Sequence, residues 1–103
     1  MVARGEVWWY EDPRAGRRPF LILTRDEAIP VLNQLLAVPA TRTVRRIPTE
    51  VRLGPGDGMP AECVLSLDNV TLVRPELCTG LITRLGDRRM AEVCEAFGRA
   101  TAC

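Results

Sequence analysis

Short apolar stretches, each closed by proline, glycine or charged residues, follow one another from residue 6 to residue 85. They are shorter than a typical helix, and several alternate apolar and polar residues, which is the period of a β-strand. The strands that they predict cover residues 6–10, 19–24, 35–40, 49–53, 62–73 (one long or broken strand) and 80–85. The sequence therefore predicts a sheet of many short strands.

The spacing of apolar residues becomes helical only near the C-terminus. Asp87 can cap a helix there. The apolar face of that helix has i, i+3, i+4, i+7 spacing and consists of Met90, Val93, Cys94 and Phe97. Short strands followed by one amphipathic helix predict an α+β, mainly β fold, in which the helix packs across a small, strongly bent antiparallel sheet or barrel. A length of 103 residues predicts a single domain, residues 1–103.

The sequence between the predicted strands predicts a short helix and several loops. Thr24 followed by Glu27 has the pattern of a capping box and predicts a short helix over residues 25–29, which Pro30 limits. Glycine, proline and charged residues predict loops at 11–18 and 54–60, and a turn or single helical turn at 75–77.

All 14 basic residues are arginine, and they are unevenly distributed. Residues 14–46 hold seven arginines against two acids, a charge of +5, which leaves −4 for the rest of the net +1. These arginines are Arg14, Arg17, Arg18, Arg25, Arg42, Arg45 and Arg46. Genomic base composition accounts for the absence of lysine, and solvated ion pairs are one explanation of the cluster. The other is a nucleic-acid surface, since guanidinium groups bind phosphate in a bidentate way.

Several classes of protein are excluded. The chain has no histidine, and Cys63, Cys78, Cys94 and Cys103 form no CxxC pair, so neither a zinc site nor a secreted disulfide framework is predicted. No apolar run approaches the roughly 20 residues that span a bilayer, and the N-terminus lacks a signal-peptide pattern. We expect a cytoplasmic protein without metal, cofactor or membrane contact.

Two arginines precede the second predicted strand, and a polar segment follows the third. Arg17 and Arg18 stand where the loop 11–18 ends, and Thr41, Arg42 and Thr43 follow the third strand. If the two strands are neighbours, these side chains face one groove, and their guanidinium and hydroxyl groups suit a phosphate diester. An exposed salt-bridging loop would explain the same spacing.

The order of several segments resembles the MazF/PemK family of toxin endoribonucleases across nearly the whole chain. The segments are RGEVWW, RRPFLILT, VPATRT, IPTEV and SLDNV, followed by the C-terminal helix. The family motifs match at Arg4-Gly5-Glu6-Val7, at Arg18-Pro19 with Phe20 in place of a small aliphatic residue, at Thr41, and at Asp68-Asn69.

This resemblance implies an SH3-like β-barrel with short helices, a homodimer, a cognate antitoxin partner, and metal-independent cleavage of single-stranded RNA, in messages or tRNA loops, that inhibits translation. It makes Arg18 and Thr41 the catalytic pair and implies that the loop 11–17 and the Asp68/Asn69 segment contact RNA. The RNA-binding candidates are Arg14, Arg17, Arg42, Thr43, Arg45, Arg46, Asp68 and Asn69. Asp68 can also be read as a simple turn residue.

Elementary chemistry limits the roles that Arg18 and Thr41 can have in this reaction. The 2'-hydroxyl of RNA can attack its own phosphorus once it is positioned, so Arg18 can stabilise the phosphorane charge and protonate the leaving group. Thr41 can hydrogen-bond a phosphate oxygen, and the proton acceptor stays open because arginine is a poor base.

Two other functions are compatible with a small barrel of this kind. A related toxin family with this barrel acts on DNA gyrase, so a non-catalytic inhibitory module is an alternative, although the RRP and VPAT motifs favour the ribonuclease. An SH3-like peptide-binding module would normally present an aromatic groove, and the chain has only five aromatic side chains. Trp8 and Trp9 must face opposite sides of a strand, so we expect one in the core and the other in a dimer interface or against a loop rather than on an RNA base.

Overall fold

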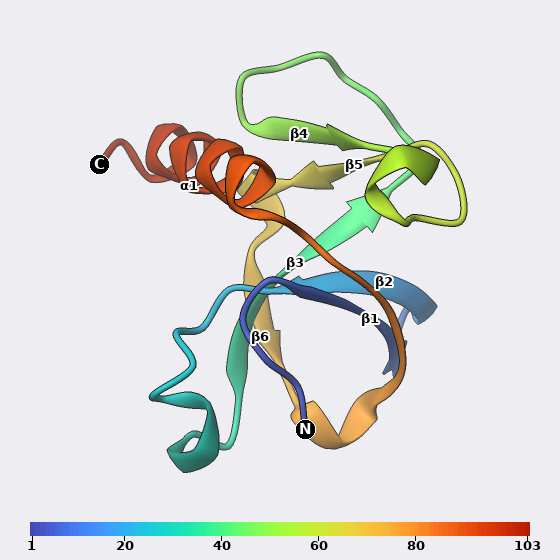
Figure 1. The fold of residues 1–103 in the computed structure, drawn as a ribbon, viewed down its shortest axis with the longest axis vertical. Helices are drawn as coiled ribbons and strands as arrows, with labels where there is room; N and C mark the ends of the chain where they lie inside the picture. Colours follow the sequence, from blue (N-terminus) through green and yellow to red (C-terminus); the bar gives the residue numbers. More distant parts are fainter.

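The computed structural model describes all residues from 1 to 103 and contains seven β-strands and one α-helix (Figure 1). The strands are β1 (Glu6–Asp12), β2 (Gly16–Ile22), β3 (Leu35–Thr41), β4 (Glu50–Leu53), β5 (Cys63–Ser66), β6 (Thr71–Val73) and β7 (Cys78–Arg84). Single turns of 3-10 helix are η1 (Ile29–Val31), η2 (Pro55–Asp57), η3 (Leu67–Asn69) and η4 (Pro75–Leu77), and α1 (Asp87–Thr101) follows β7. With 15 residues and many charges, α1 could not cross a bilayer, and the other helices are shorter still.

The strands form one antiparallel sheet in the order β4-β5-β3-β2-β1-β7, and β6 pairs with the first residues of β3. β3 joins the two halves of the sheet, since Pro39 pairs with Phe20 of β2 and Thr41 pairs with Val64 of β5. The end strands β4 and β7 do not pair, so the barrel stays open between them. The predicted mainly β fold, an SH3-like antiparallel barrel with a C-terminal helix, is confirmed.

Two apolar clusters fill the two faces of the bent sheet. The larger cluster includes Leu65 of β5 with Val93 and Ala96 of α1, so the helix packs beside β4 and β5 as Figure 1 shows. The smaller cluster contains Tyr10 and Phe20, whose rings meet edge to face with centroids 5.1 Å apart.

The start of α1 differs from the prediction in one detail. Gly86 is the N-cap, so the predicted cap at Asp87 is wrong, and Asp87 is instead the first helical residue, where its charge favours the helix dipole. Cys94, assigned to the apolar face, is exposed, and its Sγ accepts a hydrogen bond from Arg4 at 3.4 Å.

The predicted helix over residues 25–29 is wrong. Thr24 does not cap a helix, because its Oγ1 accepts a hydrogen bond from the backbone N–H of Leu36 at 2.7 Å and so ties this segment to β3. The helical turn comes later, at η1, and Pro30 lies inside its first turn, where a fixed φ and a missing N–H are tolerated.

The broken form of the strand predicted over residues 62–73 is confirmed, and the boundaries of the first hairpin change. The stretch 62–73 is broken into β5, η3 and β6, and Leu67 of η3 is buried. The first hairpin is tighter than predicted: β1 runs on to Asp12 and β2 begins at Gly16, so the loop shrinks to residues 13–15. Arg17 and Arg18 therefore lie within a strand, where neighbouring side chains face opposite sides of the sheet.

An ion pair fixes the segment between β4 and β5 against the helix. The carboxylate of Asp57 accepts hydrogen bonds from Nε and Nη2 of Arg89, at 2.8 and 3.2 Å, and from the N–H of Gly54 at 3.0 Å. Arg89 also pairs with Glu92 at 2.8 Å. The guanidinium of Arg89 holds the pKa of Asp57 below its usual value. This clamp sets the position of the residues that follow η2, which line the candidate site.

Candidate functional site

The pairing of β1 with β2 decides which side chains share a face. Trp9 is opposite Pro19 and Glu11 is opposite Arg17, so these four lie on one face. Tyr10 is opposite Arg18 on the other face. The two adjacent arginines of the RRP motif therefore have different surroundings.

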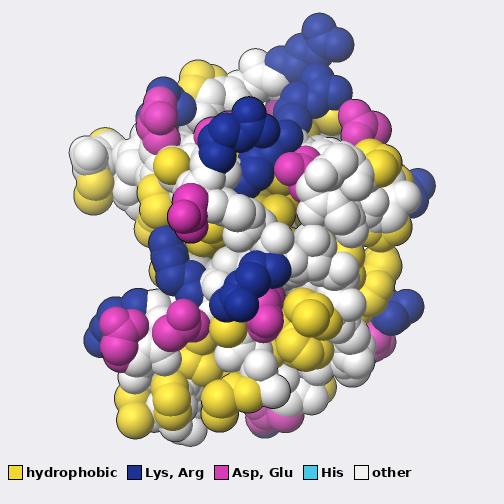
Figure 2. Space-filling model, viewed as in Figure 1, with side chains coloured by type: hydrophobic (Ala, Val, Ile, Leu, Met, Phe, Trp, Pro, Cys, Tyr) yellow, Lys and Arg dark blue, Asp and Glu magenta, His cyan; other side chains and the backbone are white.

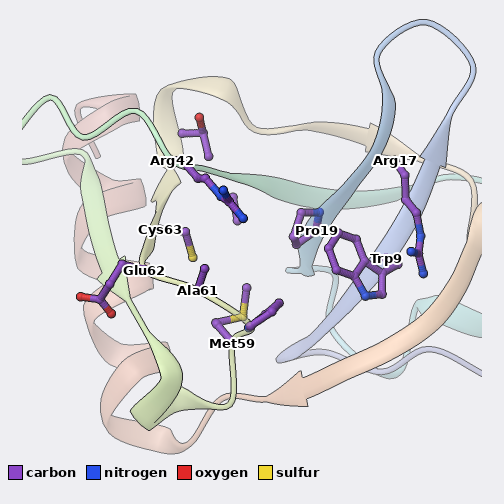
Figure 3. Close-up of a pocket in the computed structure, with 11 residues that line it drawn as sticks. Trp9, Arg17, Pro19, Arg42, Met59, Ala61, Glu62 and Cys63 are labelled. Atoms are coloured by element: carbon purple, nitrogen blue, oxygen red, sulfur yellow. The ribbon is translucent and has the colours of Figure 1, made fainter.

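A pocket of about 280 Å³ opens beside the Trp9 face, where the ends of β2 and β3 approach the segment between η2 and β5 (Figure 3). Its lining consists of Trp9, Arg17, Pro19, Ala40, Thr41, Arg42, Met59, Pro60, Ala61, Glu62 and Cys63. Figure 3 shows Trp9 and Pro19 on one side, Met59, Ala61 and Cys63 on the other, and Arg42 reaching in between them. The walls are mainly apolar and the cations lie at the rim.

Arg17 is held in place by two neighbours, Trp9 and Glu11. Its guanidinium carbon lies 4.5 Å from the ring centroid of Trp9, a cation–π contact. Its Nε lies 3.1 Å from Oε2 of Glu11, which also accepts a hydrogen bond from Thr79 Oγ1 at 3.0 Å. Gly80 of β7 lies beside this stack, and a Cβ there would be in ordinary van der Waals contact with Cδ1 of Trp9, at 3.5 Å.

Arg18 lies on the opposite face from the pocket, and its exposed guanidinium has no hydrogen-bond or ion-pair partner in the chain. The cross-strand pair Phe20–Pro39 sets the register of β2 and β3. This is the last pair of the ladder on that side, and Arg18 and Thr41 each lie two residues beyond it, near the start of β2 and at the end of β3. The half-buried Thr41 also borders the pocket, and its Oγ1 accepts a hydrogen bond from the N–H of Thr43 at 3.3 Å.

The basic segment between β3 and β4 folds back onto the carboxylate of Glu50. Glu50 accepts hydrogen bonds from the backbone N–H groups of Arg45 and Arg46, at 3.0 and 2.9 Å, and Arg46 has a left-handed φ of 57°. Two successive amides around one carboxylate form an anion-binding concavity. The side chains of Arg42, Arg45 and Arg46 stay exposed. Figure 2 shows basic side chains over the top of the molecule, where this segment runs in Figure 1.

The remaining predicted RNA contacts lie elsewhere. Asp68 and Asn69 belong to η3, at the end of β5 opposite to the end that lines the pocket. Asp68 accepts a hydrogen bond from Thr49 Oγ1 at 2.6 Å, and Asn69 donates to Ser66 Oγ at 2.8 Å. Arg14 is exposed in the hairpin turn. The structure thus gathers Arg17, Arg18, Thr41 and Arg42 at one edge of the sheet, with Thr43 just beyond β3, and separates them from Asp68 and Asn69.

Sequence reasoning did not find the far wall of the pocket. Met59, Pro60, Ala61 and Cys63 come from a stretch read only as a loop and a strand start, and nothing in their residue types signals a site. Burial, with the neighbouring carboxylates of Glu62 and Asp57, raises the pKa of the Cys63 thiol, so this wall is uncharged at neutral pH. No three His, Cys, Asp or Glu side chains cluster in a way that could hold a metal ion.

Known proteins resemble the chain along its whole length. The sequence profile of the PemK-like, MazF-like toxins of type II toxin-antitoxin systems matches residues 3–100. The probable endoribonuclease MazF5 of Mycobacterium tuberculosis is 43% identical over 104 residues, which cover 100% of this chain and 95% of that protein. A mycobacterial endoribonuclease solved in complex with its cognate antitoxin superimposes with a TM-score of 0.89, at 25% identity over 99% of this chain and 96% of the other. The Mycobacterium tuberculosis toxin MazF-mt6 gives a TM-score of 0.86, at 29% identity over 94% of this chain and 96% of the other.

Proposed function

The chain belongs to the PemK-like, MazF-like toxins of type II toxin-antitoxin systems, and from this premise we propose that it is an endoribonuclease toxin that cuts single-stranded RNA with Arg18 and Thr41. The relatives named as endoribonucleases favour this activity over a gyrase-type inhibitory module. The chain acts as one domain, residues 1–103, in the cytoplasm, where single-stranded RNA is available.

One observation carries the assignment of the catalytic pair. Arg18 and Thr41 each lie two residues beyond the last pair of the β2–β3 ladder, Phe20–Pro39, and the Arg18 guanidinium is exposed with no hydrogen-bond or ion-pair partner in the chain. A cation with unused donors can receive a phosphate diester without first breaking an ion pair. Arg17 would first have to lose its contacts with Glu11 and Trp9, which costs free energy.

In the reaction, the 2'-hydroxyl of one ribose loses its proton to solvent as its oxygen attacks the adjacent phosphorus, and the 5'-oxygen of the next nucleotide leaves and is protonated. The products are a 2',3'-cyclic phosphate and a 5'-hydroxyl. Arg18 donates to the non-bridging oxygens, where negative charge grows in the transition state, and can supply the proton to the leaving oxygen. Thr41 donates its hydroxyl hydrogen to a phosphate oxygen and so orients the diester for in-line attack. The proposal includes no metal ion, and the only protein groups that it names are the side chains of Arg18 and Thr41.

The partners follow from the same family. A mycobacterial relative has been solved with its cognate antitoxin, and we expect this chain to bind its own antitoxin and to form a homodimer. The exposed arginines of residues 42–46 suit an acidic antitoxin segment that orders as it binds.

The experiment compares cleavage of single-stranded RNA by wild type, Arg18→Ala, Arg18→Lys and Thr41→Ala, with circular dichroism to verify folding. Loss of a transition-state donor lowers kcat by about 10²- to 10³-fold, so we expect that loss for Arg18→Ala. Arg18→Lys should also be slow, because a point charge does not reproduce the bidentate fork. A folded Arg18→Ala variant that cuts RNA at the wild-type rate would refute the assignment.

A further inference from the structure

The pocket beside Trp9 has no role in the reaction as described, although it adjoins the catalytic edge. Thr41 borders it, and Arg17 on its rim is the chain neighbour of Arg18. Because the phosphate and the base of a nucleotide project in different directions from the sugar, a phosphate bound at Arg18 leaves its base free to turn elsewhere. Thr41, which we assign to the phosphate, borders the pocket, so a base next to that phosphate can enter it.

The pocket contains a fixed aromatic platform. Trp9 is backed by the guanidinium of Arg17, which Glu11 holds in turn. In Figure 3 the indole lies between Arg17 and the side chains of Met59 and Ala61, and Trp9 lines the pocket together with these residues. Unpaired bases stack on such aromatic surfaces in proteins that bind single strands.

The charged group that enters the pocket is a hydrogen-bond donor without an acceptor opposite it. Arg42 reaches into it with a guanidinium that has no hydrogen-bond or ion-pair partner in the chain, and a guanidinium can only donate. Cys63 on the far wall is a neutral thiol, and Glu62 points away from the pocket in Figure 3. An occupant therefore needs a flat apolar face for Trp9 and acceptor atoms at its edge for Arg42.

We propose that this pocket binds one unpaired base of the RNA substrate next to the cut phosphate, stacked on Trp9 and hydrogen-bonded at its edge by Arg42. The inference rests on the proposed endoribonuclease function and deepens it, because it identifies where the enzyme reads a base. A base edge with two adjacent acceptors, as guanine has in O6 and N7, suits Arg42 better than the acceptor–donor edge of adenine.

The test uses a short RNA containing one mapped cut site and a series in which each nucleotide near the cut is made abasic in turn. Cleavage of every RNA is measured with wild type, with Ala61→Leu and with Ala91→Leu. Ala61 points into the pocket, so a leucine there fills the space of the base, whereas Ala91 is exposed on α1 and adds the same bulk away from the pocket.

With wild type and Ala91→Leu, we expect one abasic position to lower kcat/KM by about 5- to 150-fold, the range that corresponds to loss of one base–aromatic stack. Ala61→Leu should cut the intact RNA more slowly by a similar factor and should be insensitive to the abasic change at that position, because the base is already excluded. At that position, guanine should be cut faster than adenine.

Two results would overturn the proposal. The first is a folded Ala61→Leu variant that keeps the wild-type sensitivity at every position. The second needs no variant and uses an RNA that carries 2-aminopurine at the sensitive position and a 2'-methoxy group that blocks the cut. The fluorescence of 2-aminopurine should change when wild type binds. Unchanged fluorescence on binding would contradict stacking. Failure of wild type to cut any RNA would instead refute the underlying endoribonuclease function, and the base pocket would fall with it.

Discussion

Arg17 and Arg18 are adjacent in the chain but face opposite sides of β2, and this separates their roles. Arg18 presents free donors on the face opposite the pocket, whereas Arg17 supports Trp9 and is partly neutralised by Glu11. A sequence motif of two arginines before a proline cannot by itself say which one is free. The difference arises from the two-residue period of the strand and from the partners that the pairing of β1 supplies.

Replacement of Arg17 by alanine should raise KM and leave kcat almost unchanged. The cation–π contact contributes about 0.5–1 kcal/mol at exposed sites, so the loss should be about 2- to 5-fold. Because Glu11 already offsets the charge of Arg17, we expect the same loss at low and at high salt. An effect confined to low salt would show that Arg17 acts as a steering charge, contrary to this account.

Trp8 and Trp9 illustrate how far residue-scale prediction extends. Their opposite orientations follow from strand geometry, and Trp8 packs against the smaller apolar cluster. The surroundings of Trp9 could not be predicted, because its pocket depends on residues 59–63, which are distant in sequence.

At the scale of elements, the contact of η2 with α1 determines the position of one wall of the pocket. Asp57 and Arg89 are 32 residues apart, and their side chains are 14% and 27% exposed. No local pattern predicts such a pairing. The strands and α1, by contrast, follow from period-two and i, i+3, i+4 spacing, and the errors lie at short turns such as residues 25–29, where contacts with other strands override local signals.

Asp57→Asn should lower the free energy of unfolding by about 1.5–3 kcal/mol at pH 7, the contribution of a hydrogen bond to a charged group. The folded-state pKa of Asp57 lies below its ordinary value of 3.8, so the stabilisation is complete above that value and disappears as the pH falls through the lower, folded pKa. Urea unfolding across pH 2–7 tests this. Glu27→Gln, at an exposed acid without hydrogen-bond or ion-pair partners, is the control. A difference between wild type and Asp57→Asn that persists at the lowest pH would contradict the clamp.

Glu50 should determine the order of the basic segment between β3 and β4. Without the carboxylate of Glu50, the amides of Arg45 and Arg46 lose their acceptors, so Glu50→Ala should speed their hydrogen exchange by about 5-fold or more. Glu50→Gln keeps one acceptor oxygen, so its exchange rates should lie between those of wild type and Glu50→Ala. Amide exchange followed by NMR provides the measurement. Equal exchange in all three proteins would mean that the segment is ordered by something else.

For the whole molecule, the open barrel leaves apolar side chains in solvent, including Leu72 and Leu81, which are 57% and 54% exposed. A second copy of the chain can cover such a surface. Sedimentation at micromolar concentration should therefore give twice the chain mass of 11.4 kDa. A species of 11.4 kDa alone would argue against the dimer.

Binding of the antitoxin should weaken as salt increases, because an acidic segment would pair with the exposed arginines of residues 42–46. Affinity measured by calorimetry at low and high ionic strength tests this for wild type and for Arg45→Ala. Arg52→Ala, at an exposed arginine of β4, provides the control. An affinity independent of salt would mean that these arginines are not its main contacts.

The central claim is that this chain cuts RNA by attack of the 2'-hydroxyl, without a metal ion. The most direct test incubates the purified protein in EDTA with single-stranded RNA and total tRNA, maps the cut ends, and repeats the reaction on an RNA with one 2'-deoxy nucleotide on the 5' side of the cut. We predict cleavage in EDTA, 2',3'-cyclic phosphate and 5'-hydroxyl ends, and no cutting of the deoxy-substituted RNA at that site. Cleavage that requires a divalent metal, or that proceeds equally well without the 2'-hydroxyl, would contradict the claim.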